Sequence, residues 1–387
     1  MNVLWIGAYP HYKFLQGHPV PWMTMLANQL ASLPDISLTV VSYHSDISQD
    51  ETIRLNGVTF VYLKVPDDKV DLLMGYSQRI KRMRAYLAEV EDGFDVLHIH
   101  GSEQQYQVMG AYTKLPTVLS VQGIVTEYLN YLPRKIDYRH ASWRVAAYYE
   151  KKFLPHINHF ICRTHWDTEH TLRLCPGAVV HQNWEPIRHE FYEPLNPRPN
   201  QATALLFVGG LNPIKGIREL LQVFDRLSQQ GNFRLIITGA GNKIQLSALI
   251  RSYSLTNINL DRVEHRGQLN SSDLRATYEE AFCLVHPSYI DNSPNSICEA
   301  QLAGLPVVAS DVGGVSSLIT SGSTGLLTSL DVKSIADAVL TLWNNPALAR
   351  SIADMARLVA LQRHDAKQIL QNTLKIYDAV MAAHSYA

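Results

Sequence analysis

Short apolar runs alternate with longer segments of helical period along the whole chain. The runs are rich in Val and Ile and are continuous rather than alternating, which is typical of strands covered on both faces of a parallel sheet. In the first half they predict strands at 2–6, 38–42, 58–63, 96–100, 117–121 and 160–162. Apolar positions at helical spacing predict helices between them at 22–33, 72–90 and 143–154. The β-then-α order predicts a doubly wound sheet.

The same rhythm restarts after the polar segment 192–202, whose three prolines disfavour both a helix and a central strand. Strands are predicted at 204–208, 233–238, 262–265, 283–285 and 307–309, with helices at 216–227, 244–253, 271–281 and 295–302. Residues 334–384 have a helical pattern. We therefore predict an α/β protein of two Rossmann-like βα domains, 1–191 and 203–365, joined by the linker 192–202 and facing each other across a cleft.

Composition limits the classes of partner. The chain has 387 residues, 46% of them hydrophobic, which favours two globular domains. Lys and Arg total 34 against 35 for Asp and Glu, so no basic field indicates a nucleic-acid partner. The four cysteines form no C-x-x-C pair, which argues against a disulfide framework or a structural zinc site. No charged leader and no apolar stretch of ~20 residues occurs, so we expect a cytoplasmic protein.

The loop in LLFVGGLNPIKGIREL follows a predicted strand and precedes a predicted helix. Gly209 and Gly210 allow a ligand to approach the backbone, and Lys215 places a positive charge beside a helix N-terminus. This combination suits a diphosphate, although a plain βα turn with a solvated lysine is the alternative. Gly239 and Gly241, in LIITGAGNKI, follow the next strand and resemble an ordinary tight turn when taken alone. The third glycine of a dinucleotide fingerprint is missing, which disfavours an NAD dehydrogenase.

The stretch DNSPNSICEAQLAGLPVVAS places two carboxylates around the start of a predicted helix. Asp291 lies in the preceding turn and Glu299 about one turn inside the helix, so both can reach a ligand at the helix N-terminus. Carboxylates accept hydrogen bonds from hydroxyl groups, and the N–H groups of residues 295 to 297 donate to hydroxyl or phosphate oxygens. These features suit a sugar nucleotide. The alternative is that Glu299 favours the helix dipole and Asp291 closes an Asx-turn.

Two histidines end the strand in DVLHIHGSE. We expect His100 to point out of the sheet edge toward the cleft and to contact a sugar. His98 is expected to be a hydrogen-bonded buried histidine on the opposite face of the strand. An H-x-H pair also fits a metal, but no third ligand lies nearby in the sequence.

The run from FVGGLNPIKG through ITGAGN and HRGQLNSSDL to PSYIDNSPNSICEAQLAGLPVVASDVGG resembles the C-terminal donor domain of glycosyltransferase family 4, whose members are retaining enzymes with the GT-B fold. Order and spacing match across about residues 204–330. The first half matches more loosely through Gly17-His18, DVLHIH and LPTVLSVQG. The resemblance implies that 1–191 bind the acceptor, that 203–365 bind a nucleotide-sugar donor, and that 366–387 return as a helix to the first domain.

The resemblance also assigns roles to individual residues. The family's E-x7-E motif falls on Asp291 and Glu299, which would contact the transferred sugar and the ribose. Lys215 would neutralise the diphosphate, and base selection is expected around Arg266 and Gly267. The implied catalytic residues are His100, Lys215 and Asp291, and the implied donor-binding residues are Gly17, Gly209, Gly210, Lys215, Gly239, Gly241, Gly267, Asn295, Ser296, Ile297 and Glu299.

Three positions depart from the family pattern. Gly210 stands where the family usually has Arg, so one charge partner of the diphosphate is missing or is supplied elsewhere. Asp291 replaces a Glu, and Ser317 stands where the family has another Glu. If Gly210 and Ser317 mean lost catalysis, the chain is an inactive sugar-nucleotide-binding scaffold or partner subunit. A UDP-sugar epimerase on the same architecture is a further alternative.

The expected reaction is retaining transfer of a hexose or related sugar from a UDP- or GDP-sugar to a saccharide or lipid-linked acceptor. No D-x-D metal site is recognised at a strand end, so we expect no metal and no other cofactor. Two basic segments in the first half, SQRIKRMRAYL and YLPRKIDYRHASWRVAAYYEKKFL, suit peripheral contact with an anionic membrane at its inner face. A solvated helix face is the alternative. Their basic residues are Arg79, Lys81, Arg82, Arg84, Arg134, Lys135, Arg139, Arg144, Lys151 and Lys152.

Overall fold

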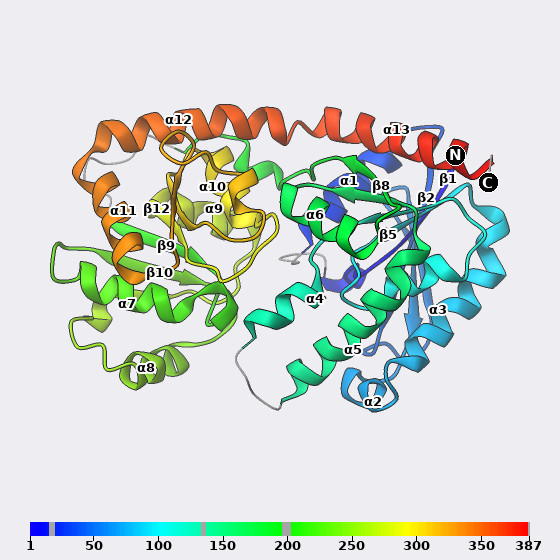
Figure 1. The fold of residues 1–387 in the computed structure, drawn as a ribbon, viewed down its shortest axis with the longest axis horizontal. Coiled ribbons are helices and arrows are strands. Elements are labelled where there is room, and N and C mark those ends of the chain that lie inside the picture. The colour runs from blue at the N-terminus through cyan, green and yellow to red at the C-terminus, as the bar shows by residue number, and fades with distance from the viewer. Residues whose placement is uncertain (15–19, 133–136, 196–202, 386–387) are drawn as a thin grey trace. The chain divides into compact units, whose positions relative to one another are not determined.

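The computed structural model describes residues 1–14, 20–132, 137–195 and 203–385. The chain divides into two compact units (Figure 1). The first unit comprises Met1–Pro186 and Asp365–Ala387, and the second comprises Ile187–His364. The tail of the chain therefore belongs to the first unit. Residues 196–202 of the predicted linker lie outside the described residues, and the cleft expected from the sequence stays a prediction.

The first unit is built on an eight-stranded sheet with the order β3-β4-β2-β1-β5-β6-β7-β8. Every neighbouring pair is parallel except β3 with β4. The strands are β1 (Asn2–Gly7), β2 (Ser37–His44), β3 (Glu51–Leu55), β4 (Val58–Lys64), β5 (Val96–His100), β6 (Thr117–Ser120), β7 (His159–Cys162) and β8 (Val179–Gln182). The α-helices are α1 (Pro21–Ala31), α2 (Asp68–Leu73), α3 (Ser77–Val90), α4 (Val125–Tyr128), α5 (Tyr138–Phe153), α6 (His165–Leu174) and α13 (Ala366–Ser385).

One face of this sheet is covered by α1 and the C-terminal helix α13. Alternate residues of the strands, such as Val3 and Trp5, form a core with Leu26 of α1 and with Ile376 and Tyr377 of α13. Successive side chains of a strand point to opposite faces of the sheet, so every second residue faces α1 and α13. The predicted return of the C-terminal helix to the first domain is confirmed.

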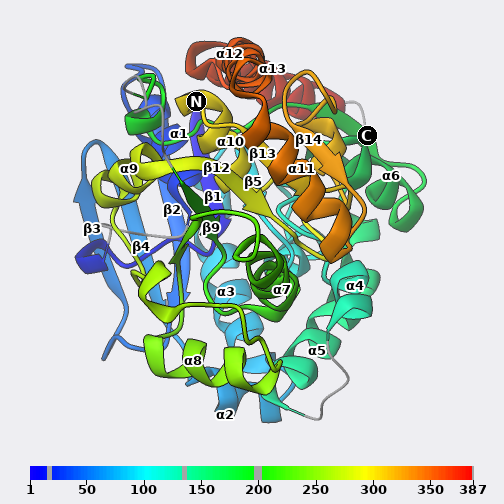
Figure 2. The same cartoon turned by 90° about the vertical axis from the view of Figure 1, so that its left-hand side faces the viewer.

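The second unit is built on a six-stranded, wholly parallel sheet with the order β11-β10-β9-β12-β13-β14. Its strands are β9 (Ala204–Val208), β10 (Arg234–Thr238), β11 (Val263–His265), β12 (Ala281–His286), β13 (Val307–Ser310) and β14 (Leu326–Thr328). Its α-helices are α7 (Ile217–Leu227), α8 (Lys243–Ser252), α9 (Ser271–Glu280), α10 (Asn295–Ala303), α11 (Val332–Asn344) and α12 (Pro346–Arg363). Figure 2 shows α7 and α11 in front of this sheet.

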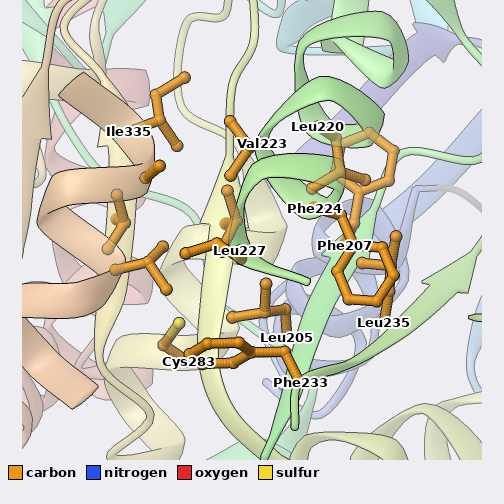
Figure 3. Close-up of a cluster of buried hydrophobic side chains, with 14 of the residues drawn as sticks. Leu205, Phe207, Leu220, Val223, Phe224, Leu227, Phe233, Leu235, Cys283 and Ile335 are labelled. Carbon is orange, nitrogen blue, oxygen red and sulfur yellow. The ribbon is translucent and has the colours of Figure 1, made fainter. Parts of the chain in front are cut away.

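The core of the second unit lies between that sheet and helices α7 and α11. Leu205 and Phe207 of β9 meet Val223 and Leu227 of α7, and Ile335 of α11 closes the cluster (Figure 3). Helix α7 has buried apolar residues on one side at helical spacing, as expected for a helix that packs against a sheet. This packing fixes the ends of β9 and β12, where the candidate site lies.

The α/β fold class and most elements predicted from the sequence are confirmed. The main error is the single helix predicted at 72–90. The chain instead forms α2 and α3, separated at Gly75 and Tyr76, which both have positive φ angles. Such backbone angles are incompatible with a continuous right-handed helix. The strands β3, β8 and β14 were not predicted.

Candidate functional site

The turn after β9 is the first part of the candidate site. Gly209 and Gly210 both donate their N–H groups to the carbonyl oxygen of Thr238, at 3.2 and 2.8 Å. Gly210 has a φ of +57°, and a Cβ at this position would lie 2.4 Å from the carbonyl oxygen of Ala240. The turn after β9 therefore packs backbone against backbone on the turn after β10. This local geometry leaves no room for the Arg that the family usually has at position 210.

Lys215 and Gly216 lead into α7, as predicted. A Cβ on Gly216, whose φ is +80°, would lie 1.8 Å from the carbonyl oxygen of Pro287. The K-G pair is thus held against the segment that follows β12. This close approach brings Lys215 beside Asp291, although 76 residues separate them in the sequence.

The carboxylate of Asp291 accepts hydrogen bonds from Lys215 and His286. Its Oδ2 lies 2.5 Å from Nζ of Lys215 and 3.0 Å from Nε2 of His286, the last residue of β12. The Asp291 residue is only 8% exposed. Burial alone raises the pKa of the carboxyl group, but Lys215 and His286 outweigh it and hold the pKa well below its usual range. Asp291 is therefore an ionised carboxylate at neutral pH.

Glu299 lies in α10 and has a different set of partners. Its Oε2 accepts a hydrogen bond of 3.2 Å from the hydroxyl of Tyr278, and its Oε1 lies 3.2 Å from Nε of Arg188. The Arg188 contact is close in distance but lacks hydrogen-bond geometry. Glu299 is 1% exposed, and burial raises its pKa to about 7 even though Arg188 and Tyr278 lower it. A carboxylate with an unsatisfied oxygen in this position can accept hydrogen bonds from ligand hydroxyl groups.

The other glycines predicted to bind the donor lie in neighbouring turns. Gly239 donates its N–H to the carbonyl oxygen of Gly267 at 2.7 Å, so the turns after β10 and β11 are joined. Gly241 packs against Leu211. The guanidinium of Arg266 is bound to Glu264 and Glu280, so its charge is already matched. These turns therefore contribute backbone groups to the candidate site, and Arg266 does not contribute a free positive charge.

The N-terminus of α10 is another predicted element of the donor site. Its N-cap residue, Pro294, supplies no side-chain cap. Ile297 donates its N–H to the carbonyl oxygen of Pro294 at 3.0 Å, so this group is used inside the turn. Asn295 is half-buried and Ser296 is buried at the first two helical positions. A helix N-terminus carries a partial positive charge, which favours an anionic ligand.

The two histidines of β5 lie on the same face of the strand, which corrects the prediction that they lie on opposite faces. Residues i and i+2 of a strand point to the same face of the sheet. The rings of His98 and His100 accordingly stack, with centroids 3.9 Å apart. The two ring nitrogens of His98 contact the hydroxyls of Tyr377 and Ser120, each at 2.7 Å. Burial lowers the pKa of His98 to about 3.

His100 is 6% exposed, and neither ring nitrogen has a hydrogen-bond partner. Burial, with a smaller effect of His98, holds its pKa well below the usual range, so the ring is a neutral imidazole. A small cavity of the first unit is lined by His98, His100, Trp22 and Ser120. A neutral ring with one free donor and one free acceptor suits a hydroxyl-bearing ligand.

Gly17, the remaining predicted donor-binding residue, lies outside the described residues. Within the described parts of the chain, no group of three or more His, Cys, Asp or Glu side chains is arranged to hold a metal ion. The described helices include none with the length and apolar character needed to cross a bilayer.

Arg188, Tyr278 and His286 contact the predicted residues but were not identified from the sequence. His286 could have been found, because it ends a strand that precedes the Asp291 turn. Arg188 and Tyr278 give no local signal, because each reaches Glu299 from a distant segment of the chain.

Comparisons with known proteins agree with this geometry. Residues 202–345 match the family model described as "Glycosyl transferases group 1". The D-inositol 3-phosphate glycosyltransferase of Pseudarthrobacter chlorophenolicus is 31% identical over 189 residues, which are 46% of this chain and 43% of that protein. The glycogen synthase of Mycobacterium tuberculosis is 29% identical over 221 residues, 56% of this chain and 52% of that protein. The matches thus span about half the length of these relatives.

Solved structures match over nearly the whole chain. Sucrose-phosphate synthase from Thermosynechococcus elongatus superposes with a TM-score of 0.79 at 18% identity, covering 99% of this chain and 100% of that one. Anabaena Alr3699/HepE in complex with UDP and glucose gives a TM-score of 0.70 at 16% identity, covering 98% and 100%. At these identities the likeness concerns the fold. Taken together, the comparisons show that residues 202–345 resemble the group 1 glycosyltransferases and that the chain has a GT-B-like fold.

Proposed function

We propose that the chain is a retaining glycosyltransferase that moves a sugar from a UDP- or GDP-sugar to an acceptor hydroxyl. The observation that carries this is the pairing of Lys215 with Asp291 in the turn that follows β12, in the same unit as the buried Glu299. A cation for the diphosphate and carboxylates for hydroxyl groups are thus supplied by the domain that matches the family model. The Alr3699/HepE structure, which has the same fold, contains UDP and glucose.

In the proposed reaction the bond between the anomeric carbon and the diphosphate oxygen breaks. The acceptor oxygen bonds to the anomeric carbon on the same face, and its proton passes to the departing phosphate oxygen. Lys215 and the N-terminus of α10 stabilise the developing charge on the diphosphate. Glu299 orients the ribose, Asp291 orients the sugar, and the neutral ring of His100 donates to a sugar hydroxyl. Because Lys215 supplies positive charge, we propose that no metal is needed.

The experiment is incubation of the chain with labelled UDP- and GDP-sugars and with simple saccharide acceptors in EDTA. The expected result is a glycoside with the donor's anomeric configuration, formed by the wild type and lost in Lys215→Ala. Conversion of the donor sugar without an acceptor would support the epimerase alternative. Binding without turnover on any acceptor would support the scaffold alternative. Activity that EDTA abolishes and Mg²⁺ restores would contradict the metal-independent part of the proposal.

We further propose that the acceptor is reached at an anionic membrane, through a surface formed by α2 and α5. The apolar residues Leu73, Met74 and Tyr148 are exposed, Leu73 by 89%. The end of α2 is tied to α5, because the hydroxyl of Tyr149 donates to the carbonyl oxygen of Gly75 at 2.9 Å. We call this surface the α2–α5 face; its members are Val70, Leu73, Met74, Tyr138, Arg139, Arg144, Tyr148, Lys151 and Lys152.

Charge on α5 supports an anionic membrane as the partner of this surface. From Tyr138 to Phe153, α5 exposes two arginines and two lysines, and its single carboxylate, Glu150, is buried. Each such cation near an anionic bilayer contributes about 1 kcal/mol of binding. The chain as a whole has a formal net charge of −1, so the basic residues are concentrated rather than general. Arg134 and Lys135 of the predicted basic segment lie outside the described residues.

Vesicle sedimentation tests this surface. The wild type should pellet with vesicles containing phosphatidylglycerol at low salt, and not with phosphatidylcholine alone. Leu73→Ser should weaken pelleting. Ile244→Ser is the matched control, because Ile244 is 81% exposed on α8 of the second unit. Equal pelleting of the two variants, or no pelleting with anionic vesicles, would exclude the membrane surface.

A further inference from the structure

The hydroxyl of Tyr377 bonds to both of the rings that flank His100. Tyr377 belongs to the C-terminal helix α13, whereas His100 ends β5. The Trp5 indole N–H donates to the Tyr377 oxygen at 2.9 Å, and the same hydroxyl lies 2.7 Å from Nδ1 of His98. Tyr377 and both partners are buried. One hydroxyl near the end of the chain thus joins β1, β5 and α13.

The rings of Trp5 and His98 both pack against the imidazole of His100. The centroid of His100 lies 4.3 Å from that of Trp5 and 3.9 Å from that of His98. The parallel register of β1 and β5 aligns Trp5 with His98 and Gly7 with His100. A Cβ on Gly7 would lie 2.9 Å from the Cβ of His100, so a glycine is needed there to leave space. His100 is therefore oriented by packing, because its own nitrogens have no protein partner.

Hydrogen bonds at both nitrogens of His98 keep that ring in one orientation. Nδ1 contacts Tyr377 and Nε2 contacts the hydroxyl of Ser120, each at 2.7 Å. Whichever tautomer is present, one nitrogen donates and the other accepts, so a neutral ring satisfies both contacts. Loss of the Tyr377 hydroxyl leaves Nδ1 of His98 and the N–H of Trp5 without this partner. Both rings beside His100 then lose a restraint.

We infer that Tyr377 is a positioning residue that holds His100 in its sugar-contacting orientation through Trp5 and His98. This inference rests on the proposed function of His100. It makes the C-terminal helix part of the catalytic apparatus of the first unit rather than only a cover for the sheet. The positioning is expected to matter for the chemical step more than for donor affinity, because it sets the orientation of a group near the reacting carbon.

The test compares Tyr377→Phe with Tyr62→Phe, a matched control on β4 of the same unit. Tyr62 is also fully buried, and its hydroxyl donates to the carbonyl oxygen of Pro10 at 3.2 Å. Tyr62 does not line the cavity beside His100. The two variants should lower the Tm by similar amounts. Tyr377→Phe should lower kcat about tenfold or more with little change in the donor KM, whereas Tyr62→Phe should change kcat less than twofold.

A second readout does not depend on activity. Long-range ¹H–¹⁵N correlation spectra of histidine-labelled protein report the tautomer of each ring, with assignments from His98→Gln and His100→Gln. In the wild type His98 should give one neutral tautomer from pH 5 to 8. Tyr377→Phe should mix the tautomers of His98 and shift the nitrogens of His100, and Tyr62→Phe should change neither.

These two readouts separate the inference from the proposed function. If the wild type transfers no sugar from any nucleotide sugar, the proposed function fails and the ring spectra alone decide the positioning. Loss of kcat in Tyr377→Phe that equals the loss in Tyr62→Phe would overturn the inference. Unchanged ring signals of both histidines in Tyr377→Phe would overturn it as well.

Discussion

Removal of Lys215 tests the local electrostatics of the candidate site. Lys215→Ala leaves the buried carboxylate of Asp291 with the hydrogen bond from His286 as its remaining side-chain partner among those described above. Removal of one member of a buried ion pair costs about 3–5 kcal/mol. The Lys215 side chain is 32% exposed, so water compensates in part and we expect a loss of about 2–3 kcal/mol in the free energy of unfolding.

A double-mutant cycle isolates the pair. Asp291→Asn and the double variant complete the cycle, and we expect a coupling energy of about 2 kcal/mol between the two sites. The protein has two units, so unfolding must be followed in the second unit alone. Trp343 is the single tryptophan between residues 187 and 364 and packs against Phe233 and Phe282. Urea unfolding monitored by ¹⁹F NMR of 5-fluorotryptophan at this position gives the required free energies.

The pH dependence follows from the lowered pKa of Asp291. A carboxyl group whose folded pKa lies below its unfolded pKa contributes stability that is present above the unfolded value of 3.8. That contribution disappears as pH falls through the folded pKa. The gap between wild type and Lys215→Ala should therefore be widest above about pH 5 and narrower at pH 3.5. Single-variant effects that add within about 0.5 kcal/mol at pH 7.5 would refute the ion-pair argument.

Three further predictions concern Glu299 and Gly210. Because the pKa of Glu299 is raised from 4.5 to about 7, wild-type stability should fall as pH rises from 4.5 to 7, by about 3 kcal/mol at most, and Glu299→Gln should remove this decline in urea titrations. Arg188→Met removes a cation that lowers the pKa of Glu299, so more of this carboxyl group should be protonated at pH 7 than in the wild type. Isothermal titration should therefore show that the variant loses more affinity for a nucleoside at pH 7 than at pH 9. A nucleoside is used because it has no phosphate to titrate. Gly210→Arg should destabilise the second unit by more than about 2 kcal/mol, since its Cβ meets Ala240, whereas Gly177→Ala, which meets nothing within 4 Å, should have almost no effect in thermal unfolding.

The fold was predictable from the sequence where strands are buried on both faces. Strands β1, β5 and β9 carry continuous apolar runs and were located within one or two residues. The strands that were missed, β3, β8 and β14, all lie at sheet edges and have few buried positions. An edge strand is covered less than a central one, so its sequence shows no strong apolar pattern. The helix predicted at 72–90 failed for another reason, because a left-handed backbone at Tyr76 has no reliable signal in the residue type.

The candidate site was predictable only in part. Asp291 and Glu299 stand at a recognisable strand-to-helix junction, and Lys215 follows a glycine turn, so local chemistry identifies all three. Their partners depend on tertiary contacts: Arg188 reaches Glu299 across 111 residues, a separation given by their positions in the sequence. The reason for a glycine at position 210 could not be predicted either, because it lies in the closeness of Ala240, which belongs to the next βα turn.

The central claim is that the second unit binds a nucleoside diphosphate sugar through Lys215 and Glu299. Isothermal titration of the chain with UDP, GDP, ADP and TDP tests it most directly, with Glu299→Ala as the site variant and Gly177→Ala as the surface control. The account predicts saturable binding of one of these diphosphates, unchanged in Gly177→Ala and lost in Glu299→Ala. Absence of binding to every one of them at millimolar concentration, or binding that survives Glu299→Ala unchanged, would contradict it.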